Sequence, residues 1–393
     1  MCLKSIHLKG TEEKVKYLSL FSGIGAFESA MKNLDIPFDL VGFSEIDKYA
    51  VKSYCAIHNV PEALNLGDIT KIDETKLGQV DFITCGFPCQ DISIAGKQYG
   101  LFNEGGKKTR SGLFFDALRV IEHTQPIVVI AENVKNLVGK KFNAQFQVVL
   151  TSLEVAGYNN YWAVLNAKDF GIPQNRERVF IVSIRKDVDT GVFEFPASYP
   201  LKLRLKDILE DVVDEKFYPS DIQLQNLQLK TTNTFDTDKV MQIGNCRPTK
   251  NRKNPNQGRI YDVNGISPCI HTMGGGNLEP HIIEPKVIGS IGEKKSNGGQ
   301  QWYQQDRIYD GDEIAISVTT GFNPYYSTLN QRIRKLTPKE CFRLMGFKDE
   351  DFEKAEKVNS NTQLYKQAGN SIVVDVAEEL LCMMFDEDGN FFV

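Results

Sequence analysis

The first 190 residues alternate short apolar runs with amphipathic helical patterns, and this alternation restricts the fold more than any other feature of the chain. Strand-like apolar runs cover residues 15–21, 40–43, 80–84, 127–131 and 178–183, and helical patterns cover residues 26–34, 48–58, 113–123 and 143–156. Strands separated by helices of this length form βαβ units, whose parallel strands share one sheet with helices on both faces. The pattern therefore predicts an α/β fold with a doubly wound, mostly parallel sheet.

Residues 191–330 differ in composition, being rich in Asn, Gln, Gly, Thr and Pro, and they contain an internal repeat. The stretch from Ile243-Gly244 to Arg259-Ile-Tyr-Asp262 is echoed by the stretch from Ile288-Gly289 to Arg307-Ile-Tyr-Asp310. Two copies are too few for a solenoid, so we interpret them as two related β-hairpins. We predict a small β- and loop-rich domain, residues 191–330, inserted into a larger domain formed by residues 1–190 and 331–393.

The α/β pattern returns near the C-terminus. Thr337 can cap a helix whose first position is Pro338 and which runs to Leu344. Residues 372–385 have the pattern of an amphipathic closing helix.

Composition excludes several classes of protein. No run of about 18 apolar residues is present, as a membrane-spanning helix would need, and residues 1–16 lack a signal-peptide pattern, so we expect a cytoplasmic protein. The eight cysteines form no Cys-x-x-Cys pair, so neither a disulfide framework nor a metal site is predicted. A net charge of −5 argues against a non-specific nucleic-acid coat, but residues 239–259 carry six Lys/Arg and no acid. This run is either a solvated loop or a patch that faces phosphates.

Polar groups follow the first predicted strands. Phe21-Ser-Gly-Ile-Gly25 is a glycine turn between a strand and a helix, although Glu28 stands where a dinucleotide pattern has its third glycine. Glu45 suits a pair of ribose hydroxyls, and Asp68 suits the amino group of a purine. Each acid alone is more often a surface or capping residue. Because the carboxyl ends of parallel strands meet at one edge of the sheet, the three groups together predict a site for an adenosine without a pyrophosphate.

A second set of reactive side chains follows later strands. Cys89, in Gly86-Phe-Pro-Cys-Gln90, can supply a nucleophilic thiolate. Glu132 directly follows the run at 127–131, where a partly desolvated carboxyl can hold a proton near neutral pH and act as a general acid. Arg176 and Arg178 precede another strand and suit a phosphate or a base carbonyl, while structural ion pairs explain their spacing equally well.

Eight motifs occur in an order that is typical of one enzyme family. They are Phe21-Ser-Gly-Ile-Gly25, Glu45, Gly67-Asp-Ile69, Gly86-Phe-Pro-Cys-Gln90, Glu132-Asn-Val134, Gln174-Asn-Arg-Glu-Arg178, Arg334-Lys-Leu-Thr-Pro338 and Gln367-Ala-Gly-Asn-Ser371. In this order they closely resemble the bacterial DNA cytosine-5 methyltransferases, which keep a target-recognition domain where residues 191–330 lie. Ser19, Ala26 and Ile92 depart from that family's usual acid, Gly and Phe, but no reacting group is missing. The resemblance implies the Rossmann-like fold of S-adenosylmethionine-dependent methyltransferases.

The resemblance also implies a reaction and a role for each matching residue. The methyl group of S-adenosylmethionine would pass to C5 of a flipped cytosine in a short specific duplex sequence, leaving S-adenosylhomocysteine. Cys89 would attack C6, Glu132 would contact N3 and the exocyclic amine, and Arg176 and Arg178 would bind the base carbonyl and hold the catalytic loop. The implied cofactor contacts are Phe21, Gly23, Gly25, Glu45, Ile46, Asp68, Ile69, Pro88, Leu113 and Asn370, and no metal is implied.

The resemblance implies that the protein is a monomer and that its partner is double-stranded DNA. A cognate restriction endonuclease is a second implied partner if the gene belongs to a restriction–modification system. Residues 90–108 would close over the flipped base. We expect the basic residues of the target-recognition domain to contact phosphates and the Thr272–Gly276 loop to contact bases. The predicted DNA contacts are Gln90, Ser93, Lys250, Arg252, Lys253, Arg259, Thr272, Gly274 and Gly275. Two alternatives are a tRNA cytosine-5 methyltransferase, which typically has Pro-Pro-Cys, and a catalytically silent DNA-binding homologue, against which the intact Cys89 and Glu132 argue.

Overall fold

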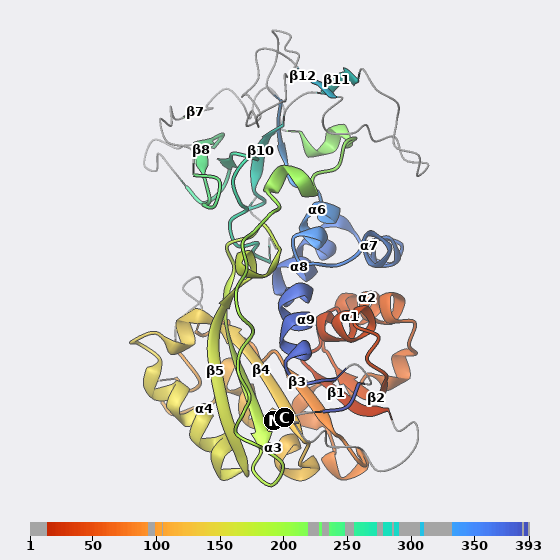
Figure 1. Ribbon diagram of the computed structural model, residues 1–393, viewed down its shortest axis with the longest axis vertical. Coiled ribbons are helices and arrows are strands. Elements are labelled where there is room, and N and C mark those ends of the chain that lie inside the picture. The colour runs from red at the N-terminus through yellow and green to blue at the C-terminus, as the bar shows by residue number, and fades with distance from the viewer. Residues whose placement is uncertain are drawn as a thin grey trace.

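Two lobes make up the computed structural model, a larger one around a six-stranded sheet and a smaller one at the top of Figure 1. The structure describes residues 14–92, 99–103, 105–218, 228–229, 236–247, 255–272, 278–284, 287–290, 307–309, 332–386 and 389–391. Within these ranges, no helix is both long enough and apolar enough to cross a membrane.

The larger sheet has the strand order β2-β1-β3-β4-β6-β5. Its strands are β1 (Val15–Leu20), β2 (Phe38–Ser44), β3 (Phe82–Cys85), β4 (Val128–Val134), β5 (Tyr158–Asn166) and β6 (Glu177–Arg185). The first four pair in parallel, which confirms the prediction, whereas β6 is antiparallel to both β4 and β5. We did not predict β5, because this half-exposed edge strand lacks the continuous apolar run of the buried strands.

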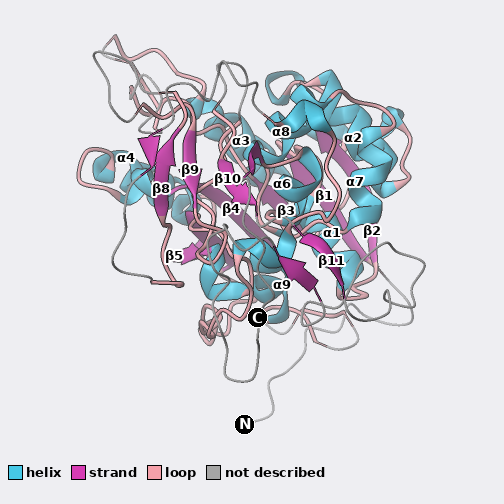
Figure 2. Ribbon diagram, turned by 90° about the horizontal axis from the view of Figure 1, so that it is seen from above, coloured by secondary structure: helices cyan, strands magenta, loops and turns pink. Residues whose placement is uncertain are grey.

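Both faces of this sheet are covered. Along the strands, side chains alternate between two apolar clusters: Tyr17 and Phe82 belong to one, and Leu18 and Ile83 to the other. α1 (Ala26–Asn33) and α9 (Val374–Cys382) pack on the first face, and α3 (Phe114–Thr124) and α4 (Asn143–Val155) pack on the second. A view from above shows helices on either side of the strands (Figure 2). The doubly wound architecture is therefore confirmed.

The C-terminal part returns to the larger lobe through a capped helix, as predicted. Thr337 Oγ1 accepts a hydrogen bond from the Glu340 N–H (3.2 Å), and Glu340 Oε2 accepts one from the Thr337 N–H (2.8 Å). This reciprocal cap begins α6 (Pro338–Arg343). α7 (Asp349–Glu356) and α8 (Asn361–Asn370) follow, and the predicted closing helix corresponds to α9. α2 (Lys48–His58) packs against α7.

The smaller lobe contains the two predicted hairpins. β8 (Gln242–Asn245) pairs antiparallel with β9 (Arg259–Tyr261), and β11 (Val287–Ser290) pairs antiparallel with β12 (Arg307–Tyr309). The registers correspond: Gly244 faces Ile260 and Gly289 faces Ile308, with one irregularity just before each glycine. The internal repeat is therefore a repeat of structure.

A five-stranded sheet organises this lobe, in the order β13-β10-β9-β8-β7. The strands not yet described are β7 (Gln228–Leu229), β10 (His281–Glu284) and β13 (Arg332–Lys335). β13 belongs to this smaller sheet, because it pairs antiparallel with β10. The sheet of the smaller lobe therefore extends past residue 331, the position at which we predict that the larger domain resumes.

Candidate active site

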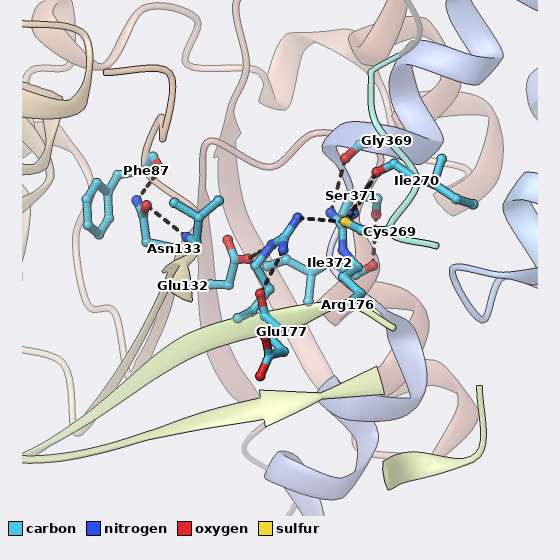
Figure 3. Close-up of polar contacts among 12 residues, drawn as sticks. Phe87, Glu132, Asn133, Arg176, Glu177, Cys269, Ile270, Gly369, Ser371 and Ile372 are labelled. Atoms are coloured by element: carbon cyan, nitrogen blue, oxygen red, sulfur yellow. Dashed lines mark hydrogen bonds and ion pairs between the residues drawn. The ribbon is translucent and has the colours of Figure 1, made fainter. Parts of the chain in front are cut away.

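Cys89 and Glu132 lie at the carboxyl ends of neighbouring strands, Cys89 in the turn after β3 and Glu132 within the last residues of β4, at the edge where a doubly wound fold places its ligands. β3 ends at Cys85, whose partner on β4 is Ala131, so the turn that carries Cys89 and the first residue after Ala131 start at the same level of the sheet. Asn133 holds the two together, because its Nδ2 donates to the Phe87 carbonyl oxygen at 2.9 Å (Figure 3). The prediction that both side chains open into one site agrees with this geometry.

Arg178 provides the charged partner of Glu132. Its Nε lies 3.1 Å from Glu132 Oε1, and the two side chains keep 17% and 13% of their surface exposed, so the pair is mostly but not fully buried. Burial raises the pKa of Glu132 above its usual range, while the charges of Arg178 and Arg176 oppose the rise. A carboxyl in this position can bind and release a proton closer to neutral pH than an exposed glutamate.

The Cys89 thiol is half-buried beside this pair. Burial raises its pKa, the negative charge of Glu132 raises it further, and Arg178 and Arg176 lower it. The thiol and the carboxyl are therefore coupled: neutralising Glu132 removes a charge that disfavours the thiolate.

Arg176 is predicted to bind the carbonyl of the flipped base together with Arg178, but main-chain oxygens hold its guanidinium instead. Its Nη1 donates to the Ile270 carbonyl (3.0 Å), and its Nη2 donates to the carbonyls of Gly369 (3.1 Å) and Ser371 (2.6 Å). Figure 3 shows this guanidinium between the end of α8 and the segment that carries Ile270. Arg176 therefore connects the two lobes, and the alternative of a structural role fits it better than a contact with a base.

The glycine turn after β1 forms the other side of the site. Phe21, Gly23 and Gly25 all have positive φ, at 55°, 57° and 82°. Gly23 N–H donates to Glu45 Oε2 at 3.0 Å, and nothing lies within 4 Å of the position where a side chain on Gly23 would begin. Ser22 Oγ beside it is buried without a partner. An open backbone cradle with an orphaned hydroxyl and a carboxylate fits a polar small molecule such as S-adenosylmethionine.

Glu45 and Asp68 are joined by a residue between them. Asn65 Oδ1 accepts from the N–H groups of Glu45 (3.2 Å) and Gly67 (3.0 Å), which fixes the end of β2 against the turn that begins at Asp68. Burial raises the pKa of Glu45, although backbone N–H groups that bind the carboxylate oppose this. Asp68 Oδ1 accepts from the Thr70 N–H at 3.0 Å, which lowers the pKa of Asp68.

The remaining predicted cofactor residues differ in exposure. Ile69 is buried, Pro88 and Leu113 are half-buried, and Ile46 and Asn370 are exposed. A methyl group built on Gly86 would lie 3.9 Å from both the Phe21 carbonyl oxygen and Glu132 Oε2, so the turn after β1 borders the Glu132 carboxyl. The described residues contain no group of three or more His, Cys, Asp or Glu that could hold a metal ion.

Only some of the predicted DNA contacts lie among the described residues. Gln90 is exposed and its Oε1 accepts from Arg110 Nη1 at 2.7 Å; Arg259 lies on β9, and Thr272 is exposed beyond Ile270. The predictions for Ser93, Lys250, Arg252, Lys253, Gly274 and Gly275 fall outside the described residues.

The family of C-5 cytosine-specific DNA methylases matches residues 15–385. The chain belongs to this family. The methylase is 36% identical to the orphan methyltransferase M.SPRI of Bacillus phage SPR, with 93% of this chain and 96% of that protein covered. It is 31% identical to the type II methyltransferase M.HhaI of Haemophilus parahaemolyticus, over 93% and 92% of the two chains. The predicted family and enzyme class are confirmed.

Solved structures show the same fold as the methylase. A mutant DNMT2 of Spodoptera frugiperda superposes with a TM-score of 0.60 at 19% identity, covering 94% of this chain and 99% of that one. The Entamoeba histolytica methyltransferase EhMeth also gives 0.60, at 15% identity, over 95% and 98% of the chains. At such identities the likeness supports the fold alone.

Three residues that shape the methylase's site are not among those that the sequence predicts. Asn133 directly follows Glu132 in the motif Glu132-Asn-Val134, so the motif itself indicates a residue of the site at this position. Asn65 carries no signal, because a single Asn before a glycine turn is common. Cys269 follows the first repeat; its sulfur lies 3.5 Å from Arg176 Nη1 and 3.8 Å from Arg178 Nη2, a contact that only the tertiary structure reveals.

Proposed function

We propose that the methylase transfers the methyl group of S-adenosylmethionine to C5 of a cytosine flipped out of a short, specific duplex DNA sequence, through a covalent bond between Cys89 and C6. The observation that carries the proposal is the Arg178–Glu132 pair beside the Cys89 thiol, at the carboxyl ends of β3 and β4. Such a site needs the base outside the helix, since C6 is otherwise stacked between neighbouring bases.

Each side chain has a step to perform. The Cys89 thiolate forms a bond to C6 while N3 of the base takes a proton from Glu132, and this addition makes C5 electron-rich. Arg178 keeps the carboxyl in place and stabilises the negative charge that the proton leaves on it. After methylation, the C5 proton passes to a base, the N3 proton returns to Glu132 and the Cys89 sulfur departs as a thiolate, which restores the aromatic ring.

The turns after β1 and β2 would hold the cofactor. We assign Phe21, Gly23, Gly25, Glu45, Ile46, Asp68, Ile69, Pro88, Leu113 and Asn370 to that site, with Glu45 at the ribose and Asp68 at the purine amino group. S-adenosylmethionine, when bound, supplies an electrophilic methyl group. The predicted monomer and a partner endonuclease are parts of the same proposal, as are the DNA contacts.

A methyl-transfer assay tests the proposal. The full chain is incubated with tritium-labelled S-adenosylmethionine and either unmethylated duplex DNA or tRNA, and bisulfite sequencing then locates the modified cytosines. We expect label in DNA at one short sequence, none with Cys89→Ala, and wild-type activity with Cys382→Ser, which removes an exposed thiol. Label in tRNA alone would establish the RNA alternative, and DNA binding without transfer would establish the silent homologue.

The covalent step has its own assay. A duplex with 5-fluorocytosine at the target should form a denaturation-resistant complex with the wild-type chain, since fluorine at C5 cannot leave as a proton does. Methylation of ordinary DNA with no such complex would contradict the bond between Cys89 and C6.

A further inference from the structure

The segment Ser267–Thr272 of the smaller lobe is joined to the approach to β6 at four points. Ser267 N–H donates to the Pro173 carbonyl (2.7 Å), and Asn175 N–H donates back to the Ser267 carbonyl (2.9 Å). Ile270 N–H donates to the buried Gln174 side chain (3.0 Å), and the Ile270 carbonyl accepts from Arg176, as described above. The segment is therefore fixed to the strand that carries Arg178.

Cys269 lies in the middle of this segment, and its side chain faces the arginines. Its sulfur lies 3.5 Å from Arg176 Nη1 and 3.8 Å from Arg178 Nη2, within the range of a sulfur hydrogen bond. Figure 3 shows Cys269 beside the Arg176 guanidinium. Arg178 thus has three partners: Glu132 through Nε and the Glu177 carbonyl through Nη1 (2.8 Å) in the larger lobe, and Cys269 through Nη2 in the smaller lobe.

The charges around this sulfur favour a role as acceptor. Arg176 and Arg178 both approach the sulfur, while Glu132 and Cys89 interact with Arg178. The thiol itself lies 3.7 Å from the Ile270 carbonyl oxygen, and His271 stands two residues further along the chain. Burial alone would raise the pKa of Cys269, yet the two arginines together lower it below its ordinary value. Of the cysteines near the site, Cys85 and Cys89 have raised pKa values, so the arginines distinguish Cys269 from both.

We propose that Cys269 is a positioning residue: its sulfur fixes the Arg178 guanidinium from the side of the smaller lobe, so that Glu132 is aligned for proton transfer only while the segment Ser267–Thr272 is in place. This inference rests on the proposed function. Because Thr272 opens the predicted base-reading loop, the contact links DNA reading to the reacting groups. It acts through Arg178 and involves no contact between Cys269 and the base.

Three variants test the role through the methylation reaction. Cys269→Ala removes the acceptor, Cys269→Ser keeps one, and Cys246→Ala removes a buried thiol of the same lobe that packs with Ile243, Ile260, Ile283 and Ile333. We expect Cys269→Ala to lower the single-turnover rate about 10-fold or more, the effect of losing one hydrogen bond to a charged group. Affinity for S-adenosylmethionine, affinity for DNA and the melting temperature should stay at wild-type values. Cys269→Ser should recover to within about 3-fold of wild type, and Cys246→Ala should match wild type.

A rate for Cys269→Ala equal to that of Cys246→Ala would overturn the proposal. So would an equal loss in the Ser and Ala variants, because the Ser variant keeps the acceptor. A second measurement needs no DNA: the ¹³Cβ chemical shift of labelled cysteine, assigned with Cys269→Ser, follows ionisation of this thiol. Its midpoint should rise in Arg178→Gln, which removes one of the two charges that lower the pKa of this thiol, and an unchanged midpoint would show that Arg178 does not contact the sulfur. If the wild-type chain methylated no nucleic acid, the proposed function would fail. The chemical-shift measurement would still decide whether Cys269 and Arg178 are in contact.

Discussion

Arg178 on β6 and Glu132 on β4 are diagonal neighbours on one face of the sheet. In the antiparallel register Arg178 faces Val134 and Glu132 faces Phe180, so the two side chains emerge from the same side, two residues apart. This diagonal position allows the 3.1 Å contact between Nε and Oε1. The antiparallel register of β6 therefore brings Arg178 to the Glu132 carboxyl.

Glu132→Gln should slow methyl transfer strongly. The amide keeps the size of the side chain but can neither give a proton to N3 nor pair with Arg178 as an ion. We expect the single-turnover rate to fall by about 10²–10⁴-fold, the contribution of a positioned general acid. Binding of S-adenosylmethionine, measured by calorimetry, should not change. A loss below about 10-fold would remove Glu132 from the proton-transfer step.

The same variant should change the acidity of the nucleophile. Glu132 in its charged form raises the pKa of Cys89, so replacing it with a neutral amide should lower that pKa. In a series of iodoacetamide reactions at increasing pH, followed by peptide mass spectrometry, the midpoint for Cys89 should move to lower pH in Glu132→Gln. The exposed Cys382 provides the internal control and should react alike in both proteins. An upward shift would contradict the coupling.

The sequence identified the parts of the fold and site that depend on local patterns. Strands β1 to β4 follow from apolar runs, α6 follows from the Thr337 cap, and the paired hairpins follow from the repeat. In each case the signal and the structure lie within a few tens of residues of each other.

Features that depend on distant pairing could not be obtained in this way. The direction of β6 is set by its partners β4 and β5, and its apolar residues fit a parallel or an antiparallel strand equally. Arg176 illustrates the same limit at the level of one side chain. Its three carbonyl partners lie 94 to 195 residues away, so spacing could not distinguish it from Arg178.

Asp68→Ala should weaken cofactor binding, if this side chain holds the purine amino group. We expect a loss of about 1.5–3 kcal/mol for a hydrogen bond to a charged group, which is roughly 10- to 150-fold in Kd. Asp73→Ala is a matched control, because Asp73 caps the next short helix in the same manner, through Thr75. Calorimetry with S-adenosylmethionine compares them, and equal affinities would exclude Asp68 from the adenosine site.

The predicted DNA contacts should separate into two kinds. Replacing Lys250, Arg252 and Lys253 by Ala should weaken binding to all DNA alike, and each lost phosphate contact should reduce the slope of log affinity against log salt by about 0.9. Thr272→Ala should instead reduce discrimination against a one-mismatch site, where one base contact is worth about 1–3 kcal/mol. Binding to cognate and mismatched duplexes at several salt concentrations measures both effects. The opposite assignment would follow if the triple variant lost discrimination and the Thr272 variant kept it.

Gly369→Ala should separate α8 from the smaller lobe. A Cβ on Gly369 would lie 2.5 Å from the Thr272 nitrogen and closer still to the His271 carbonyl, and both are backbone atoms that cannot rotate away. In an unobstructed helix this substitution stabilises by about 0.5–1 kcal/mol, so a melting temperature below that of the wild type would reveal the clash. We expect a net destabilisation of about 1–3 kcal/mol, typical of overpacking.

Gly105→Ala is the control for stability, because a Cβ there meets only Asn103 Oδ1 at 3.5 Å. Methyl transfer should fall in Gly369→Ala because the same displacement strains the carbonyls that hold Arg176. A Gly369→Ala variant as stable as Gly105→Ala and as active as the wild type would show that this contact is dispensable.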